Sequence, residues 1–340
     1  MSFKGFLLLL IVLALLADSS DAWGRRRRRR SGSRRRRSSL SMRVATGITS
    51  IFKPSSSCKI GSNDYPYSQD LARKMFVYCG IAYYQKEPSL LEWKCHSCRV
   101  NPLVTRFDII ASHTYSSLQL AYFVGYDPAL QAVVVAIRGS DGPNVANWFG
   151  VNFRIAKVVP SLFPADSGKV HKGFNNAYNA IRNQMWAAVL STQREARSKY
   201  HVTTPNRVYV TGHSMGGALG VFAALDLRVN RGMDVIMMSF GAPRVGDECF
   251  AAYYGRHVTK SIRVAHSLDP VTLLPPTPVL GYYHVPRYHN DRSSRFSHVA
   301  YVGYKLSELS NKRRKRRHVI ITDLTPHLNK HNKYTHYYMK

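Results

Sequence analysis

Residues 207–219, RVYVTGHSMGGAL, join an apolar run to a glycine-rich turn and a segment rich in small residues. The residues Arg207–Thr211 have the composition of a buried strand, and Ala218–Leu227 is predicted to be helical. Between them lies a G-x-S-x-G pattern, residues 212–216. In a strand–turn–helix context, its glycines permit a strained turn that lifts the serine above the sheet edge, at the positive end of the next helix. The pattern therefore predicts Ser214 as a nucleophile.

The segments around this turn alternate between the two kinds of element. The apolar run 132–137, AVVVAI, is typical of a strand buried on both faces. We predict strands over 121–127, 131–138, 207–211, 235–240 and 261–265, and helices over 65–85, 173–200 and 218–227. This alternation predicts an α/β fold in which helices cover both faces of a mostly parallel central sheet.

A serine nucleophile requires a histidine base and an acid that orients the histidine. With this type of turn, the chain order is serine, acid, histidine. Asp269 directly follows the predicted strand 261–265, and Pro270 shapes the turn after it. Asp247 is the competing carboxylate, but it opens the next element and is better explained as a helix cap. We therefore predict Asp269 as the acid.

The base must come later in the chain, where seven histidines follow. They are His284, His289, His298, His318, His327, His331 and His336. His284 and His289 follow Asp269 too closely for a separate loop, which directs attention to the C-terminal stretch 323–338, DLTPHLNKHNKYTHYY.

Acyl chemistry also requires donors for a developing oxyanion. One is expected to be the backbone N–H after the nucleophile, at Met215, and the other should follow an earlier strand. The strand 131–138 ends in Arg138-Gly139-Ser140, where Ser140 offers both an N–H and a hydroxyl. This chemistry requires no metal and no organic cofactor.

The N-terminus predicts secretion. A basic start, the apolar run Phe6–Ala17 and the small residues Ser20 and Ala22 form a signal peptide over residues 1–22. The apolar run is shorter than the roughly 17–25 residues that a spanning helix needs. We therefore expect a secreted protein without a transmembrane helix in its mature chain.

Secretion places the five cysteines in an oxidising compartment. They are Cys58, Cys79, Cys95, Cys98 and Cys249. We expect one or two disulfides and one remaining thiol, with the pairing left open. A zinc pair at Cys95 and Cys98 would need a second pair of ligands at matching spacing, and none is evident.

The chain of 340 residues carries a formal net charge of +30. Its 45% hydrophobic content excludes a wholly disordered chain. Dense arginine runs make residues 23–44 a disordered segment, which fits a propeptide, a tether for polyanions or a solvated tail. A second basic block, residues 312–317, is expected on an exposed loop. The remaining residues, 45–340, would form one domain.

Several stretches together resemble the class 3 (fungal-type) lipases, an α/β-hydrolase family, over roughly residues 65–340. They are AIRGS from Ala136 with ANW from Ala146, VHKGFNNAY from Val170, TGHSMGGAL from Thr211, SFGAPRVGD from Ser239 and RVAHSLDPVTLLPP from Arg263. The resemblance implies the α/β-hydrolase fold, Ser214 as nucleophile and Asp269 as acid. It also implies Ser140 and Met215 at the oxyanion hole, and a lid over the site formed by about residues 141–151.

In this family the histidine usually has an aromatic residue three positions later, often as Asp-His-x-x-Tyr. His331 has Tyr334 at that spacing but Lys330 before it. The stretch around His327 resembles another family variant but lacks the tyrosine. We therefore place the base at His331, with His327 and then His336 as alternatives.

The resemblance implies a secreted carboxylic-ester hydrolase that acts on lipids, either triacylglycerol or phospholipid. The basic chain favours an anionic lipid–water interface. The alternative is a catalytically inactive, cationic protein that binds surfaces or polyanions with the same fold.

Overall fold

The structure is a computed structural model that describes residues 58–61, 64–84, 88–115, 120–140, 156–203, 205–267, 269–293 and 297–310. Several predicted segments lie outside these residues. They are the signal peptide (1–22), the Arg-rich segment (23–44), the lid (141–151), the second basic block (312–317) and the histidines His327, His331 and His336.

A seven-stranded mixed sheet forms the centre of the molecule. Its strands, in spatial order, are β1 (Asp108–Tyr115), β2 (Leu120–Asp127), β3 (Ala132–Ile137), β6 (Arg207–His213), β7 (Asp234–Phe240), β8 (Ser261–Ala265) and β9 (Tyr288–Asn290). The first three strands pair antiparallel, and β3, β6, β7, β8 and β9 run parallel. The predicted α/β fold with a mostly parallel central sheet is confirmed.

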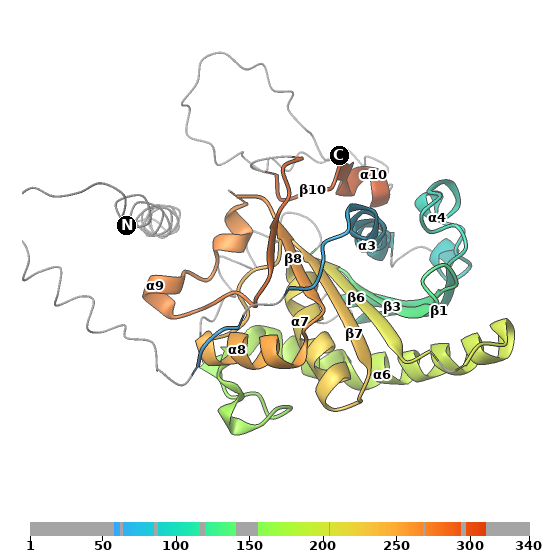
Figure 1. Ribbon diagram of the computed structural model, residues 1–340. Coiled ribbons are helices and arrows are strands. Elements are labelled where there is room, and N and C mark those ends of the chain that lie inside the picture. The colour runs from blue at the N-terminus through green and yellow to red at the C-terminus, as the bar shows by residue number, and fades with distance from the viewer. Residues whose placement is uncertain are drawn as a thin grey trace, which may run out of the picture.

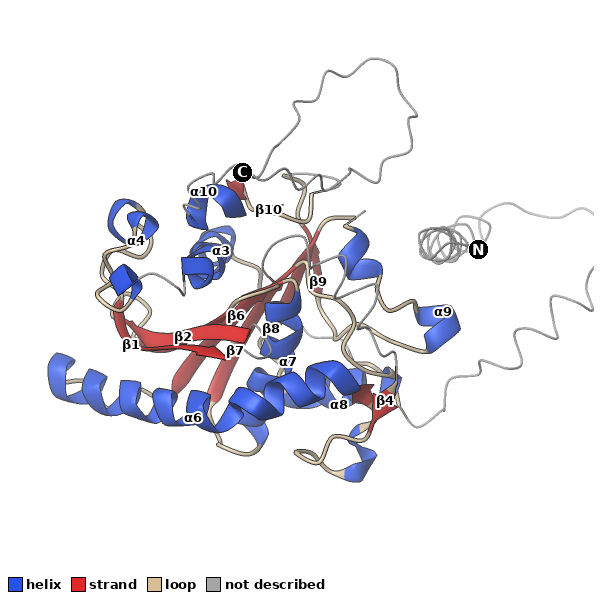
Figure 2. Ribbon diagram, turned by 180° about the vertical axis from the view of Figure 1, so that it is seen from behind, coloured by secondary structure: helices blue, strands red, loops and turns tan. Residues whose placement is uncertain are grey.

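Helices cover both faces of this sheet (Figures 1 and 2). They are α3 (Gln69–Ile81), α4 (His96–Val100), α6 (Lys172–Tyr200), α7 (Met215–Val229), α8 (Glu248–His257), α9 (Thr277–Leu280) and α10 (Leu306–Ser310). In the part of the chain that the structure describes, none of them is long and apolar enough to cross a membrane. Short 3-10 turns are η2 (Ala82–Tyr84), η3 (Pro88–Leu90), η5 (Ala165–Ser167) and η6 (Pro270–Leu273), and short strand pairs are β4 (Lys157–Val158) with β5 (Val170–His171) and β10 (Ala300–Tyr301) with β11 (Tyr304–Lys305).

The alternation of side chains along the strands divides the core into two layers. On β3, Val133, Val135 and Ile137 pack with α6, α7 and α8, whereas Val134 and Ala136 pack with α3 and α10 on the opposite face. Successive strand residues point to opposite faces, so a strand apolar at every position must be covered on both sides. This arrangement explains the continuous apolar run of β3.

The predicted helices and strands are all present, but two strands of the central sheet were missed. The edge strand β1 carries polar residues such as Ser112 and Thr114, and it pairs only with β2. The strand β9 has three residues, too few to show a periodicity. Asp247 caps α8 through its side chain, which accepts a hydrogen bond from Phe250 N, as predicted for this competitor.

Two disulfides bind four of the five cysteines, and the buried Cys79 is a free thiol. The bridge Cys58–Cys249 attaches the extended N-terminal segment to α8 across 191 positions. Two bridges and one remaining thiol agree with the prediction.

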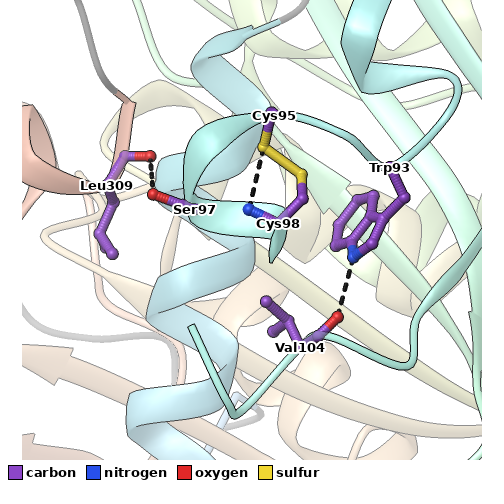
Figure 3. The surroundings of a disulfide bond; sticks show 6 residues. All are labelled: Trp93, Cys95, Ser97, Cys98, Val104 and Leu309. Carbon is purple, nitrogen blue, oxygen red and sulfur yellow. Dashed lines mark hydrogen bonds between the residues drawn. A yellow bond between two sulfur atoms is a disulfide. The ribbon is translucent and has the colours of Figure 1, made fainter. Parts of the chain in front are cut away.

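The bridge Cys95–Cys98 closes the first turn of α4 (Figure 3). Beside it, Ser97 Oγ donates a hydrogen bond of 2.7 Å to the carbonyl of Leu309 in α10. The indole N–H of Trp93 donates to the carbonyl of Val104 at 2.8 Å. The Ser97 hydrogen bond holds α4 against α10, the last element that the structure describes, and the Trp93 hydrogen bond joins the segments on either side of α4.

Candidate active site

The carboxyl ends of four parallel strands meet at one edge of the sheet. Cα partners Ile137 and Gly212 join β3 to β6, and His213 and Phe240 join β6 to β7. Phe240 in turn pairs with Val264 of β8. The residues that directly follow these strands are therefore brought together, as expected for ligand sites in parallel sheets.

Ser214 occupies a strained turn between β6 and α7. Its φ of 56° and ψ of −127° lie in a region that non-glycine residues seldom adopt, at a cost of about 1–3 kcal/mol. The neighbours must be glycine, since a Cβ at Gly212 would lie 2.3 Å from backbone atoms of Gly216. Ser214 Oγ is buried and has no hydrogen-bond partner among the described residues. The turn thus presents an unengaged hydroxyl at the sheet edge.

Asp269 follows β8 and is fully buried. Its carboxylate accepts hydrogen bonds from His298 Nδ1 at 2.8 Å, from Val271 N at 2.9 Å and from the Tyr301 hydroxyl. Burial alone would raise the pKa of Asp269, but the charge of His298 and these hydrogen bonds outweigh burial and lower the pKa. Asp269 is therefore held as a carboxylate.

The histidine beside Asp269 is His298, which the sequence analysis named among seven and then passed over. Because Nδ1 faces the carboxylate, it carries the proton that is donated to Asp269, and Nε2 of the neutral ring is left with its lone pair. Nε2 is buried and has no hydrogen-bond partner among the described residues. The placements predicted for His331, His327 and His336 stay predictions, because those residues lie outside the described part of the chain.

A signal for His298 was present in the sequence. His298-Val299-Ala300-Tyr301 has an aromatic residue three positions after the histidine, the same spacing that favoured His331. In the structure, Tyr301 and His298 donate to the same carboxylate oxygen, Oδ2 of Asp269. The spacing that favoured His331 therefore also occurs at the histidine that the structure places beside Asp269.

The two residues predicted for the oxyanion hole are in contact. Ser140 follows β3 and is buried, with its Oγ 3.6 Å from Met215 Sδ. Met215 is the first residue of α7, where backbone N–H groups have no acceptor within the helix. The backbone N–H groups of Ser140 and Met215 and the Ser140 hydroxyl are therefore available at this edge of the sheet to donate hydrogen bonds to an oxyanion.

Gly241 packs against the acid and directly follows the residue that is bonded to the nucleophile turn. The N–H of Ser214 donates to the carbonyl of Phe240, one residue before Gly241. A Cβ at Gly241 would lie 2.9 Å from Asp269 Oδ2 and 3.0 Å from His298 Nδ1. The backbone after β7 therefore lies against both the nucleophile turn and the Asp269–His298 pair.

No cluster of three or more His, Cys, Asp or Glu suited to a metal ion occurs within the described residues. The acid, the histidine, the serine and the two donor residues can together carry out nucleophilic attack on an acyl group and stabilise the resulting oxyanion.

Comparison with known proteins agrees with this arrangement. Residues 134–279 match the family model "Lipase (class 3)". The secreted mono- and diacylglycerol lipase 1 of Fusarium solani is 35% identical over 184 residues, which are 54% of this chain and 51% of the relative. The lipase of Rhizomucor miehei is 30% identical over 228 residues, 64% of this chain and 58% of the relative. The chain thus spans about half the length of the curated relatives it matches.

The fold is shared with solved lipase structures. The Rhizomucor miehei lipase–propeptide complex aligns with a TM-score of 0.56 at 21% identity, over 77% of this chain and 93% of the solved chain. The Rhizomucor miehei triacylglyceride lipase aligns with a TM-score of 0.57 at 23% identity, over 72% and 98%. Residues 134–279 of this chain thus match the class 3 lipase family model, and the chain has the α/β fold of these solved lipases.

Proposed function

We propose that this protein is a serine ester hydrolase that cleaves acyl esters of lipids, with Ser214 as nucleophile, His298 as base and Asp269 as acid. One observation carries the proposal. His298 is bonded to Asp269 through Nδ1, while its Nε2 and the hydroxyl of Ser214 are both buried and unpartnered within the described residues. Buried polar atoms are normally satisfied, so the serine hydroxyl on the strained turn and the free nitrogen of the histidine bonded to Asp269 are available to a substrate and to a proton transfer.

The reaction follows from these groups. Nε2 of His298 takes the proton of Ser214 as the oxygen attacks the ester carbonyl. Asp269 stabilises the imidazolium, and donors from Ser140 and Met215 stabilise the oxyanion. The imidazolium then protonates the leaving alcohol. Water then attacks the acyl-enzyme as His298 takes its proton, and His298 passes that proton to the Ser214 oxygen as the carboxylic acid departs.

The substrate class is supported by the names of relatives and by exposed apolar side chains. Relatives carry the names mono- and diacylglycerol lipase and lipase. Val159 and Val279 are about half exposed, and Lys157 links their segments by donating to the carbonyl of Leu280 at 3.0 Å. Apolar side chains beside a lysine suit a lipid surface with some negative charge. Acylglycerols at such an interface are therefore the proposed substrates, with phospholipid second.

The competing function is a non-catalytic protein that binds anionic surfaces. The net charge of +30 is the observation that favours it. Such a protein would retain the fold but show no difference between the wild type and a variant lacking the Ser214 hydroxyl.

The test is hydrolysis of a short-chain ester, emulsified diacylglycerol and triacylglycerol, and anionic phospholipid vesicles. We expect Ser214→Ala and His298→Ala each to lower turnover by on the order of 10⁴-fold or more. His331→Ala is the matched control and should retain turnover. Loss of activity in His331→Ala but not in His298→Ala would reassign the base. No hydrolysis by folded wild type above the Ser214→Ala level would favour the binding protein.

Secretion is part of the proposal, with cleavage of the signal peptide after Ala22. The intact mass of the protein recovered from a culture medium tests it. A chain that begins at Trp23 would support signal cleavage alone, and one that begins at Ser38 would support a processed Arg-rich propeptide. A mass that includes residues 1–22 would contradict both.

A further inference from the structure

His213, the residue before the nucleophile, connects two parts of the site. Its Nε2 lies 2.6 Å from the backbone carbonyl of His298, and its Nδ1 lies 3.0 Å from the Tyr83 hydroxyl. Tyr83 comes from η2, directly after α3. The Tyr83 hydroxyl also accepts a hydrogen bond from the backbone N–H of Gly139, which precedes Ser140.

The chemistry of these groups fixes the direction of every hydrogen bond. A carbonyl oxygen only accepts, so Nε2 of His213 must carry its hydrogen. In a neutral ring, Nδ1 is then an acceptor, and the Tyr83 hydroxyl must donate to it. Because Gly139 N–H donates to Tyr83, the chain of donors runs in one direction from Gly139 through Tyr83 and His213 to His298. Hydrogen bonds aligned in this way strengthen one another.

The surroundings keep His213 neutral. Burial, and then the neighbouring charge of His298, lower the pKa of His213 to about 3. A cationic His213 would repel the imidazolium that forms on His298, since the two ring centroids are only 4.6 Å apart. A neutral His213 has a single N–H group, and it donates this group to the carbonyl of His298.

The backbone of His298 needs such support. His298 lies before β10, which begins at Ala300, so no strand of the central sheet includes it. Asp269 holds one end of the ring through Nδ1. The His213 N–H holds the main chain from which the ring extends, which sets where Nε2 can point.

We propose that Tyr83 and His213 are positioning residues that align His298 with the nucleophile and the oxyanion donors. The inference rests on the proposed hydrolase function. Packing supports the coupling, because a Cβ at Gly139 would lie 2.5 Å from the Tyr83 hydroxyl and 3.2 Å from Ser214 Cβ. The strand end that carries Ser140, the nucleophile turn and the His298 loop therefore cannot move independently.

The test compares two substitutions at His213 that differ in whether the new side chain can donate a hydrogen bond to the carbonyl of His298. His213→Leu removes the donor to the carbonyl of His298, whereas His213→Gln can place an amide N–H there. We expect kcat for a short-chain ester to fall about 10–100-fold in His213→Leu, with KM nearly unchanged, because sub-ångström displacement of a reacting group is costly. His213→Gln should recover most of this loss.

Tyr83→Phe retains the ring but removes the hydroxyl, and should lower kcat about 10-fold. Tyr254→Phe is its control, because the buried Tyr254 hydroxyl forms a hydrogen bond of 3.0 Å with Ser261 Oγ, between α8 and β8. Thermal unfolding of each variant verifies the fold. Tyr254→Phe should lower the midpoint without changing kcat.

Labelling of Ser214 with an aryl phosphonate gives a second readout, since it depends on activation of the serine by His298. Its rate should fall in the same order as kcat. Equal kcat and labelling rates in wild type, His213→Leu and Tyr83→Phe would overturn the positioning role. Equal losses in His213→Leu and His213→Gln would also overturn it, since the donor would then be irrelevant. Absence of both hydrolysis and labelling in the wild type would instead reject the proposed function itself, and this inference with it.

Discussion

Gly241 provides a sharp test of the site, because one methyl group there would enter the space between the acid and the base. The Cβ of Gly241→Ala would lie 2.7 Å from the Tyr301 hydroxyl, 2.9 Å from Asp269 Oδ2 and 3.0 Å from His298 Nδ1. Ordinary contact begins at about 3.4 Å, so these atoms must retreat by about 0.4–0.7 Å. All three belong to the hydrogen-bonded unit that orients His298.

Two costs are expected, and they can be separated. Gly241 has a φ of +58°, which costs an alanine about 1–2 kcal/mol of stability. Overpacking adds about 1–3 kcal/mol. The displacement of His298 should also lower kcat about 10–100-fold, because a shift of 1 Å in a reacting group costs on the order of 10²-fold.

Gly232→Ala is the matched control. Gly232 has a φ of +68°, but a Cβ there would meet nothing within 4 Å. This variant should lose about 1–2 kcal/mol of stability and keep its turnover. Urea unfolding and ester hydrolysis, measured on both variants, separate backbone strain from displacement of the site. A Gly241→Ala protein with kcat within twofold of wild type would refute the placement of His298 beside Asp269.

Three further predictions concern the acid, the oxyanion donors and the long disulfide. Tyr301→Phe removes a donor from Asp269, whose folded pKa is depressed, so it should cost about 1.5–3 kcal/mol in urea unfolding at pH 7. The loss should shrink as the pH falls through the lowered folded-state pKa of Asp269, where the carboxyl group becomes protonated in the folded protein; a loss that grows on acidification would contradict the argument. Ser140→Ala should lower kcat about 10²–10³-fold with a small change in KM if its hydroxyl binds the oxyanion, and unchanged kcat would limit its role to the N–H. Joint substitution of Cys58 and Cys249 by serine should cost about 2–5 kcal/mol, because the bridge closes a loop of 191 positions; a thermal midpoint equal to that of wild type would contradict this estimate.

The centre of the sheet and the strained turn at Ser214 were predictable because their signals are local. A run such as AVVVAI is apolar at each position, and only a strand covered on both faces can bury it. The turn at Ser214 has its glycines at fixed offsets, which close packing between β6 and α7 demands. Asp269 followed from its place after a strand and before a proline.

The histidine was less accessible to sequence reasoning, because the elements around it are short. The strand β9 has three residues and β10 has two, so neither shows a periodicity. The prediction of the base therefore depended on how long the loop between Asp269 and the histidine was expected to be. In the structure, β9 pairs with β8, and the chain turns back after it, which brings His298 to the acid within 29 positions.

The disulfide pairing has a similar explanation. Cys58 and Cys249 are far apart in the sequence, and only the packed structure brings their Cα atoms to 4.7 Å. Cys95 and Cys98 are three positions apart and bridge within one helical turn, a spacing that also suits metal or redox chemistry. The number of cysteines limited the disulfides to one or two, but it did not identify which cysteines pair.

The spacing of histidine and tyrosine has a physical basis that also bears on the base. Because β10 begins two residues after His298, the chain carries both His298 Nδ1 and the Tyr301 hydroxyl to one oxygen, Oδ2 of Asp269. Oδ1 accepts from Val271 N, so the fully buried carboxylate already serves three donors. A second pair with the same spacing, such as His331 and its tyrosine, would have to compete with these donors for the same buried carboxylate. The occupied carboxylate is therefore the strongest physical argument that His298 is the base, and it makes the His298→Ala and His331→Ala pair a decisive comparison.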